Sequence, residues 1–449
     1  MLRGGACKTD RRVIMGLSTL TFFSNYFNHH QKALCDSFRS LLGEGFTFVE
    51  TEPMEGFREK MGWGEESKPY ILRTYEGRKQ EERAMELAVS SDLVIMGTAP
   101  ERFIEERLKR DRIIFRYSER PLKEGFIKFF IPRLTVKYLH LHVRNRKKRI
   151  YILAASAYAA WDYKKMFDSY PGKIYKFGYF PKHLEYDVKE LFERKEEAAL
   201  KSYGDRGLAT ILWEGRMLKL KGPDLVVRAA SVLRSRGYDF RLRFVGDGKL
   251  RSRVERLCHS LGLGDIVSFE GFLSPGEARE RMAEHKIYVM SSNFLEGWGS
   301  VIYEALNAGC ACVVSHAPGA APWLVRHGET GLLYESGRLE SLVRQLELLL
   351  KDPELVKRYG SNAYDLMHRE WNEMTAAKNV LTLYEDLSRG RDTSIESGPC
   401  SRAEILKNNW YKEMIRSGDR TDRSEPRFAP KRTICRQTGA DKEGGSQPL

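Results

Sequence analysis

Two glutamates are placed to do chemistry in the stretch NFLEGWGSVIYEALNAGC, residues 293–310, with seven residues between them. Glu296 comes just before a Gly-Trp-Gly step, and Glu304 lies on the second turn of the helix that the following residues predict. Gly297 and Gly299 leave the backbone amides at the positive end of that helix uncovered, where phosphate oxygens bind. Glu304 can then accept hydrogen bonds from the hydroxyls of a ribose, and Glu296 from those of a sugar beyond the diphosphate.

Trp298 stands between the two glycines and belongs to the same candidate donor-binding segment. A lone glutamate in a loop is usually an exposed charge, and a lone glutamate on a helix usually lies on the helix surface. That simpler interpretation stays open for Glu296 and Glu304, although it does not account for the glycines between them. We expect the segment to hold a nucleotide sugar at three points.

The segment EGRMLKLKG, residues 214–222, predicts a second part of the same site, because it follows a strand and opens a helix. Arg216 and Lys221 flank a loop that contains Gly215 and Gly222. Two cations beside exposed backbone amides suit a diphosphate. An ordinary basic loop between a strand and a helix is the alternative.

The next strand ends in VGDG, residues 245–248, where Gly246 and Gly248 allow the backbone to approach a ligand closely. As a dinucleotide fingerprint this motif is weak, because the third glycine is missing and the helix opens with Lys249 and Arg251.

His29 and His30 follow the first expected strand and begin a helix. A histidine at that place can orient a hydroxyl or a phosphate. His29 is the candidate for a catalytic role. Both histidines are otherwise explained as surface residues that cap the helix.

Strands alternate with helical stretches along both halves of the chain, which predicts two α/β domains with parallel sheets. The expected strands of the first half cover residues 11–17, 46–50, 92–97, 112–118, 149–156 and 173–180. Those of the second half cover residues 208–215, 239–248, 266–271, 287–292 and 311–316. Ligands of open α/β sheets bind at the carboxyl ends of the strands, so we expect the chemistry in a cleft between two facing domains.

The domain boundaries follow from changes in composition. We expect residues 1–185 to form the first domain and residues 208–390 to form the second. The charged helical residues 186–207 are expected to connect them. From residue 391 to residue 449 the chain is polar and rich in Gly, Ser and Arg, which is typical of a loosely ordered tail.

Composition limits the class of protein. A chain of 449 residues with 42% hydrophobic residues supports two globular domains. Its seven scattered cysteines indicate reduced thiols in a cytoplasmic protein, and the start of the chain has no convincing signal peptide. No apolar run approaches the roughly 18 residues that a membrane-spanning helix needs.

The net charge of +14 predicts attraction to an anionic partner. Bulky apolar and basic residues follow one another over residues 126–149, which suits either peripheral contact with an anionic membrane at the inner face of the cell membrane or a buried element followed by a solvated basic loop. Nucleic acid is not an expected partner, because no helix-turn-helix, RNP-type or finger pattern accompanies the charge.

Residues 208–371 resemble the nucleotide-sugar domain of retaining glycosyltransferases of family 4, which have the GT-B fold of two facing Rossmann-like domains. The resemblance rests on five ordered motifs: GRMLKLKG, VGDG, FEGFLSPGE, SSNFLEGWGSVIYEALNAG and GETGLLY. The first half resembles the family only loosely. FNHHQ and YKFGYFP are similar to segments of bacterial surface-polysaccharide transferases of this family.

The resemblance implies that Arg216 and Lys221 bind the donor diphosphate, that Glu296 and Glu304 form the family's pair of glutamates, and that residues 297–299 approach the phosphates. It also implies a reaction without a metal or another cofactor. The expected reaction is retaining transfer of a hexosyl group from a UDP- or GDP-linked sugar to a glycan or lipid-linked glycan acceptor. A catalytically inactive membrane-associated scaffold and a dinucleotide-dependent oxidoreductase remain as alternatives.

Overall fold

The fold is described by a computed structural model that covers residues 16–54, 56 and 67–418. Residues 1–408 belong to one compact unit and residues 409–449 to another. The described part of the second unit contains helix α16 (Trp410–Gly418). Most of the strand expected at residues 11–17 lies outside the described residues, as do Cys7 and Cys435.

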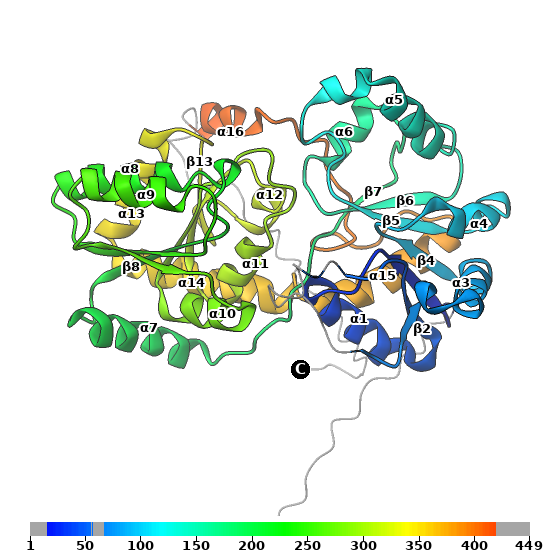
Figure 1. Ribbon diagram of the computed structural model, residues 1–449, viewed down its shortest axis with the longest axis horizontal. Coiled ribbons are helices and arrows are strands. Elements are labelled where there is room, and N and C mark those ends of the chain that lie inside the picture. Colours follow the sequence, from blue (N-terminus) through cyan, green and yellow to red (C-terminus); the bar gives the residue numbers. More distant parts are fainter. Residues whose placement is uncertain (1–15, 55, 57–66, 419–449) are drawn as a thin grey trace, which may run out of the picture. The chain divides into compact units, whose positions relative to one another are not determined.

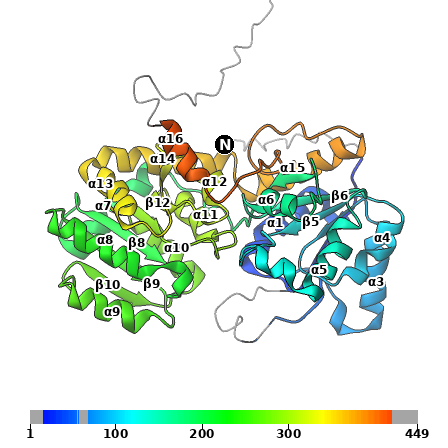
Figure 2. The same ribbon diagram turned by 90° about the horizontal axis from the view of Figure 1, so that it is seen from above.

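The first unit contains two parallel sheets, and the first of them forms what we call the first lobe (Figure 1). Its seven strands are β1 (Leu20–Ser24), β2 (Phe46–Glu50), β3 (Ile71–Arg73), β4 (Leu93–Met96), β5 (Ile114–Ser118), β6 (Ile150–Ala154) and β7 (Ile174–Lys176). Its longer helices are α1 (His29–Leu42), α3 (Arg78–Ser90), α4 (Glu105–Lys109), α5 (Pro132–Tyr138) and α6 (Ala159–Lys165). The short helical turns are η1 (Gly43–Gly45), η2 (Thr74–Glu76), η3 (Glu101–Ile104), η4 (Phe126–Phe130) and η5 (Leu139–Val143). Helices α3 and α4 lie side by side, as the view from above also shows (Figure 2).

The second sheet and its helices form the second lobe. Its six strands are β8 (Ala209–Glu214), β9 (Phe240–Val245), β10 (Val267–Gly271), β11 (Ile287–Met290), β12 (Ala311–Ser315) and β13 (Gly331–Tyr334). Its helices are α7 (Val188–Tyr203), η6 (Lys219–Lys221), α8 (Pro223–Ser235), α9 (Arg251–Ser260), α10 (Pro275–Glu284), α11 (Ser300–Asn307), α12 (Ala321–Leu324), α13 (Leu339–Lys351) and α14 (Pro353–Arg369).

Both sheets reverse their strand order at one place. The first sheet runs β3-β2-β1-β4-β5-β6-β7, and the second runs β10-β9-β8-β11-β12-β13. The reversal falls between β1 and β4 in the first sheet and between β8 and β11 in the second. In doubly wound sheets, the crevice at the carboxyl ends of these two strands is where ligands bind.

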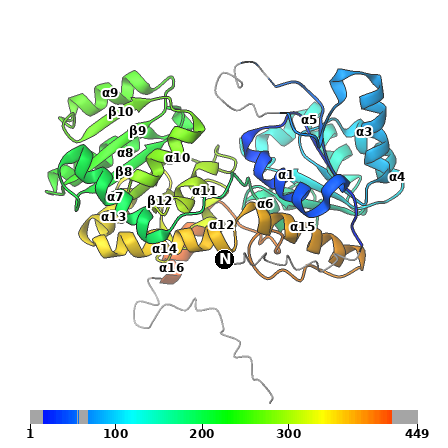
Figure 3. The same cartoon turned by 90° about the horizontal axis from the view of Figure 1, so that it is seen from below.

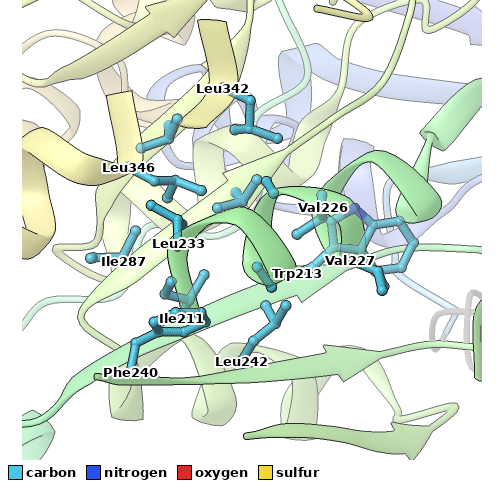
Figure 4. Packing of buried hydrophobic residues seen from close by; sticks show 14 of the residues in the cluster. Ile211, Trp213, Val226, Val227, Leu233, Phe240, Leu242, Ile287, Leu342 and Leu346 are labelled. Atoms are coloured by element: carbon cyan, nitrogen blue, oxygen red, sulfur yellow. The ribbon is translucent and has the colours of Figure 1, made fainter. Parts of the chain in front are cut away.

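The strands form here because their sequences are almost continuously apolar, as strands covered by helices on both faces must be. Every residue of β4, β11, β12 and β13 is buried. In the second lobe, Val227 and Leu233 of α8 pack against Ile211 and Trp213 of β8, with Leu342 of α13 in the same cluster (Figure 4). The two predicted parallel α/β domains are therefore confirmed. The strands β1, β3 and β13 are additions to the prediction.

Two parts of the chain depart from the expected boundaries. Helix α15 (Glu373–Ser388) was expected to belong to the second domain, but it packs against α1 of the first lobe (Figure 3). Residues 391–408 are not a loose tail: Arg402 pairs with Tyr175 of β7, and Cys400 is fully buried. Composition did not indicate this contact because the segment supplies backbone hydrogen bonds to a sheet edge, for which polar residues suffice. The rest of the expected tail, residues 419–449, lies outside the described residues.

Candidate active site

The loop after β8 holds Arg216 by backbone contacts with the loop after β9. The Met217 amide donates to the Asp247 carbonyl at 2.7 Å, and the Leu250 amide donates to the Met217 carbonyl at 3.0 Å. A Cβ atom on Gly246 would lie 2.1 Å from the Gly215 carbonyl oxygen, so only glycine fits between the two loops. Gly246, which was predicted to contact a ligand, contacts the loop that carries Arg216.

Gly248, two residues after Gly246, also allows close packing against the loop that carries Arg216. Its φ of +149° is outside the usual range of L-residues, and a Cβ atom there would lie 2.9 Å from the amide nitrogen of Met217. Neither Gly246 nor Gly248 is among the residues that line the cavity described below. The two glycines set the position of Arg216 through close backbone packing.

Lys221 and Glu296 are brought together by the ends of β8 and β11. Lys221 Nζ lies 2.5 Å from Glu296 Oε2, and the two side chains are 13% and 15% exposed. The Ser291 hydroxyl donates to the Lys221 carbonyl at 2.6 Å and accepts from the Trp213 indole N–H at 2.9 Å. This chain of hydrogen bonds fixes η6 against the end of β11, and it explains why a lysine and a glutamate 75 positions apart meet.

The glycines around Trp298 allow the two lobes to approach each other. A Cβ atom on Gly297 would lie 2.0 Å from Oε2 of Glu119, a first-lobe residue. Gly299 has a φ of +88° and precedes α11, whose first turn has no capping side chain. The uncapped amides at the start of α11 are available to an anion, as the sequence predicts.

Trp298 is only 1% exposed, and its ring lies against Gly178 of the first lobe, where a Cβ atom would be 2.2 Å from the ring. Its ring also neighbours Trp323 and Trp371. The indole therefore packs chiefly within the protein, although Trp298 also lines the cavity described next.

A cavity of about 720 Å³ lies at the strand ends where both sheets reverse their order. The second lobe lines it with Arg216, Glu296 and residues 298–300. From the first lobe come residues that follow β1, β4 and β5, among them Asn25, Thr98 and Arg120. The volume is in the range of pockets that enclose a small-molecule ligand. Two predicted residues, Arg216 and Glu296, thus share one cavity with the start of α11, and Lys221 joins them through its ion pair.

Glu304 is half-buried on α11 beside an arginine that the sequence did not single out. Arg279 Nη1 of α10 lies 3.5 Å from Glu304 Oε1. Burial raises the pKa of Glu304, and the neighbouring guanidinium group opposes that rise. Glu304 does not line the 720 Å³ cavity, so the structure brings together Glu296 and Arg216 but sets Glu304 to one side.

Glu214, the last residue of β8, is a second acid that the sequence analysis missed. Burial, followed by the negative charge of Glu304, raises the pKa of Glu214 to about 8, against the effect of Lys221 and Arg279. Its Oε2 atom has no hydrogen-bond partner among the described residues. The carboxyl group is therefore largely protonated at neutral pH and able to donate a hydrogen bond. Its position directly before Gly215 was the only signal in the sequence.

The side chains of His29 and His30, at the start of α1, line different pockets. Asn28 caps this helix by accepting from the His30 amide at 3.0 Å. His30 lines the 720 Å³ cavity and stacks on Tyr179, and burial lowers the pKa of its imidazole to about 3. His29, the predicted catalytic candidate, lines a different pocket of about 420 Å³ with Arg279. The structure thus brings His30, and not His29, together with Glu296 and Arg216. Among the described residues, no group of three or more His, Cys, Asp or Glu side chains could hold a metal ion.

Comparison with known proteins finds a match for most of the second lobe. Residues 195–366 match the family described as glycosyl transferases group 1. The matched segment contains Arg216, Lys221, Glu296 and Glu304.

Two relatives illustrate the extent of the similarity. The alpha-D-kanosaminyltransferase of Streptomyces kanamyceticus is 29% identical over 185 residues, which are 41% of this chain and 47% of that protein. A D-inositol 3-phosphate glycosyltransferase of Streptomyces griseus is 34% identical over 165 residues, which are 34% of each chain. The chain thus spans less than half the length of these curated relatives.

Solved structures extend the likeness to the first lobe. HepE of Anabaena, solved in complex with UDP, matches with a TM-score of 0.59 and 16% identity over 83% of this chain and 100% of its own. Sucrose-phosphate synthase from Thermosynechococcus elongatus matches with a TM-score of 0.57 and 17% identity over the same shares. At such identities the likeness concerns the fold, which is the GT-B arrangement of two Rossmann-like domains.

Proposed function

We propose that the chain transfers a hexosyl group from a nucleotide-diphosphate sugar to a hydroxyl acceptor with retention of the anomeric configuration. One observation supports this proposal most directly. A single cavity lies where both sheets reverse their strand order, and it is lined by Arg216, Glu296 and the uncapped start of α11. Lys221 adds a second cation through its 2.5 Å contact with Glu296. In this proposal Glu296 accepts hydrogen bonds from the donor sugar, and Glu304 from the ribose.

The physical basis of catalysis is stabilisation of the leaving diphosphate. As the bond to the anomeric carbon breaks, negative charge grows on the diphosphate and the sugar gains oxocarbenium character. Fixed cations and helix-end amides stabilise such charge without reorganising during the reaction. Arg216, Lys221 and the amides of residues 299–301 supply these groups from this chain, so that the reaction needs no metal ion. The bound nucleotide is UDP or GDP, and the chain acts in the cytoplasm.

The acceptor is a glycan or a lipid-linked glycan, and the first lobe presents it at an anionic membrane surface. Helix α5 has no buried residue, and Ile127, Phe130 and Val136 are 76%, 73% and 65% exposed. Residues 125–161 contain no Asp or Glu. Large exposed apolar side chains surrounded only by cations suit the interface of an anionic bilayer. None of the described helices is long and apolar enough to cross a membrane.

The test of this function is a donor screen on the purified full chain. Calorimetric titration with UDP, GDP, ADP and NAD identifies the nucleotide, and we expect UDP or GDP to bind. Transfer is then measured with the matching nucleotide sugars in EDTA, and the anomeric configuration of the product is read by proton NMR. Tight binding of NAD would favour an oxidoreductase instead. Nucleotide binding without either hydrolysis or transfer would favour an inactive scaffold.

A further inference from the structure

The first-lobe end of the cavity contains two buried arginines that carboxylates hold in place. Arg116, with a side chain 8% exposed, donates to both oxygens of Glu101 at 2.6 and 2.7 Å. Arg120, with a side chain 5% exposed, donates to both oxygens of Asp162 at 3.1 and 2.9 Å. Both arginines line the 720 Å³ cavity. Bidentate pairing fixes the orientation of each guanidinium group.

Each of these arginines keeps one buried N–H group without a partner. Among the described residues, Arg116 Nε and Arg120 Nη1 make no hydrogen bond. Buried polar groups are nearly always hydrogen-bonded, and a guanidinium group cannot lose its proton to escape that requirement. The two groups therefore lack acceptor atoms within the described protein, and both arginine side chains line the cavity beside them.

The donor chemistry of these groups favours a ligand with anionic oxygens. The cations that line the cavity are Arg116, Arg120, Lys123 and Arg216, the carboxylates that line it are Glu119 and Glu296, and Glu101 and Asp162 balance the charge of the two first-lobe arginines. Lys123 Nζ lies 3.2 Å from Glu119 Oε2, so an ion pair also holds this third first-lobe cation in the cavity lining. Planar guanidinium donors match the oxygens of a phosphate, and charged donors bind them more strongly than they bind a sugar hydroxyl.

We propose that Arg116, Arg120 and Lys123 form an anion pocket that binds a phosphate or diphosphate group of the acceptor. This proposal rests on the proposed transfer and adds the chemical class of its acceptor. The pocket adjoins the exposed apolar surface along the chain: Lys123 precedes η4, and His142, which also lines the cavity, lies in η5 directly after α5. A phosphate attached to a lipid and the phosphate of a soluble sugar phosphate share this chemistry.

The experiment measures anion binding separately from donor binding. Inorganic pyrophosphate is titrated into the full chain carrying Arg216→Ala, which lacks the donor-site arginine, and binding is followed by calorimetry and phosphorus NMR. We expect binding to persist in this variant and to weaken at least tenfold when Arg120→Lys is added. Lysine keeps a positive charge beside Asp162. It cannot both pair with Asp162 and keep a further N–H donor in a fixed direction, as the guanidinium group of Arg120 does with Nη1. Arg116→Lys is the parallel variant, and circular dichroism checks the fold of each.

Arg102→Lys is the matched control, because Arg102 is also paired with a glutamate, Glu81, but does not line the cavity. We expect it to leave the affinity for pyrophosphate unchanged. The proposal is overturned if the Arg216→Ala protein does not bind pyrophosphate, or if neither Arg120→Lys nor Arg116→Lys weakens binding. The pyrophosphate titration does not depend on the outcome of the donor screen. Failure of the proposed transfer and failure of the proposed anion pocket can therefore be told apart.

Competition distinguishes the two sources of the phosphate. Farnesyl phosphate and glucose 6-phosphate are each added to the protein with bound pyrophosphate. Stronger displacement by farnesyl phosphate supports a lipid-linked acceptor, and stronger displacement by glucose 6-phosphate supports a soluble one. If neither displaces pyrophosphate, the pocket does not bind an acceptor phosphate and the proposal fails.

Discussion

The two lobes share a sheet topology but position their charged groups by different means. In the second lobe, Arg216 and Lys221 stand on loops held by backbone contacts that only glycine permits, as at Gly246 and Gly222. In the first lobe, Arg116 and Arg120 are held by ion pairs with carboxylates from other elements. Backbone packing presents Arg216 without using its charge, whereas Lys221 is also paired with Glu296.

This difference determines what each lobe can bind. Arg216 has no ion pair with a carboxylate among the described salt bridges, so its full charge is available to a diphosphate. The first-lobe arginines are already paired and offer one oriented N–H each. The second lobe is suited to stabilising charge that develops during a reaction, and the first lobe to recognising a group of fixed shape.

The largest expected effect is at Arg216. If the second lobe stabilises the leaving diphosphate, Arg216→Ala lowers kcat/KM for donor hydrolysis about 100-fold or more, the usual cost of removing one preorganised donor to a developing anion. Hydrolysis of the nucleotide sugar is measured without an acceptor, so that binding of an acceptor to the first lobe does not affect the rate. Lys219→Ala is the control, because Lys219 lies in η6 with Lys221 but does not line the cavity. Near-normal hydrolysis by the Arg216→Ala protein would contradict this division between the lobes.

The same difference explains what the sequence could predict. The candidate site of the second lobe is carried by local motifs, and the spacing of Glu296, Gly297 and Gly299 predicts its place in the chain. The pairs Arg116–Glu101 and Arg120–Asp162 join residues that no short motif links, so they were invisible before the fold was known. Most strands were predicted where they are apolar and buried, but the buried strands β1 and β13 were missed. Short β3, with only half-buried residues, was also missed.

The contact between the lobes gives the next largest effect. Gly178 of the first lobe lies against the ring of the buried Trp298, so Gly178→Ala forces that ring or the backbone to move. Overpacking of this kind costs about 1–3 kcal/mol of unfolding free energy. Urea unfolding of the variant measures it. Gly264→Ala is the control, since a Cβ atom at Gly264 meets nothing within 4 Å. Equal stabilities of the two variants would show that the interface is loose.

The next prediction concerns the first lobe and its exposed apolar side chains, among them Ile127 and Phe130. Replacing Ile127 and Phe130 with Asp removes two exposed apolar side chains and adds two negative charges next to a basic segment. We expect about tenfold weaker binding to vesicles that contain phosphatidylglycerol, measured by co-sedimentation, because burial of such side chains in the bilayer interface is lost. Phe272→Asp alters a 52% exposed side chain of the second lobe and should not change binding. Binding that is indifferent to anionic lipid in the unaltered protein would remove membrane contact from the proposal.

The last prediction concerns Glu214 of the second lobe and the dependence of stability on pH. Burial raises the pKa of this carboxyl group in the folded protein to about 8, whereas in the unfolded chain it has its ordinary value near 4.5. Between these pH values the folded state holds a proton that the unfolded state has released, so the stabilisation of the folded state by this group is lost as pH rises. Glu214→Gln removes both ionisations. Its unfolding free energy relative to the unaltered protein should therefore increase from pH 5 to pH 8, by on the order of 3 to 4 kcal/mol, and level off above about pH 9. Urea unfolding at several pH values measures this difference. A difference that does not vary with pH would mean that Glu214 is ionised in the folded protein, and the second lobe would then carry a negative charge beside its diphosphate site.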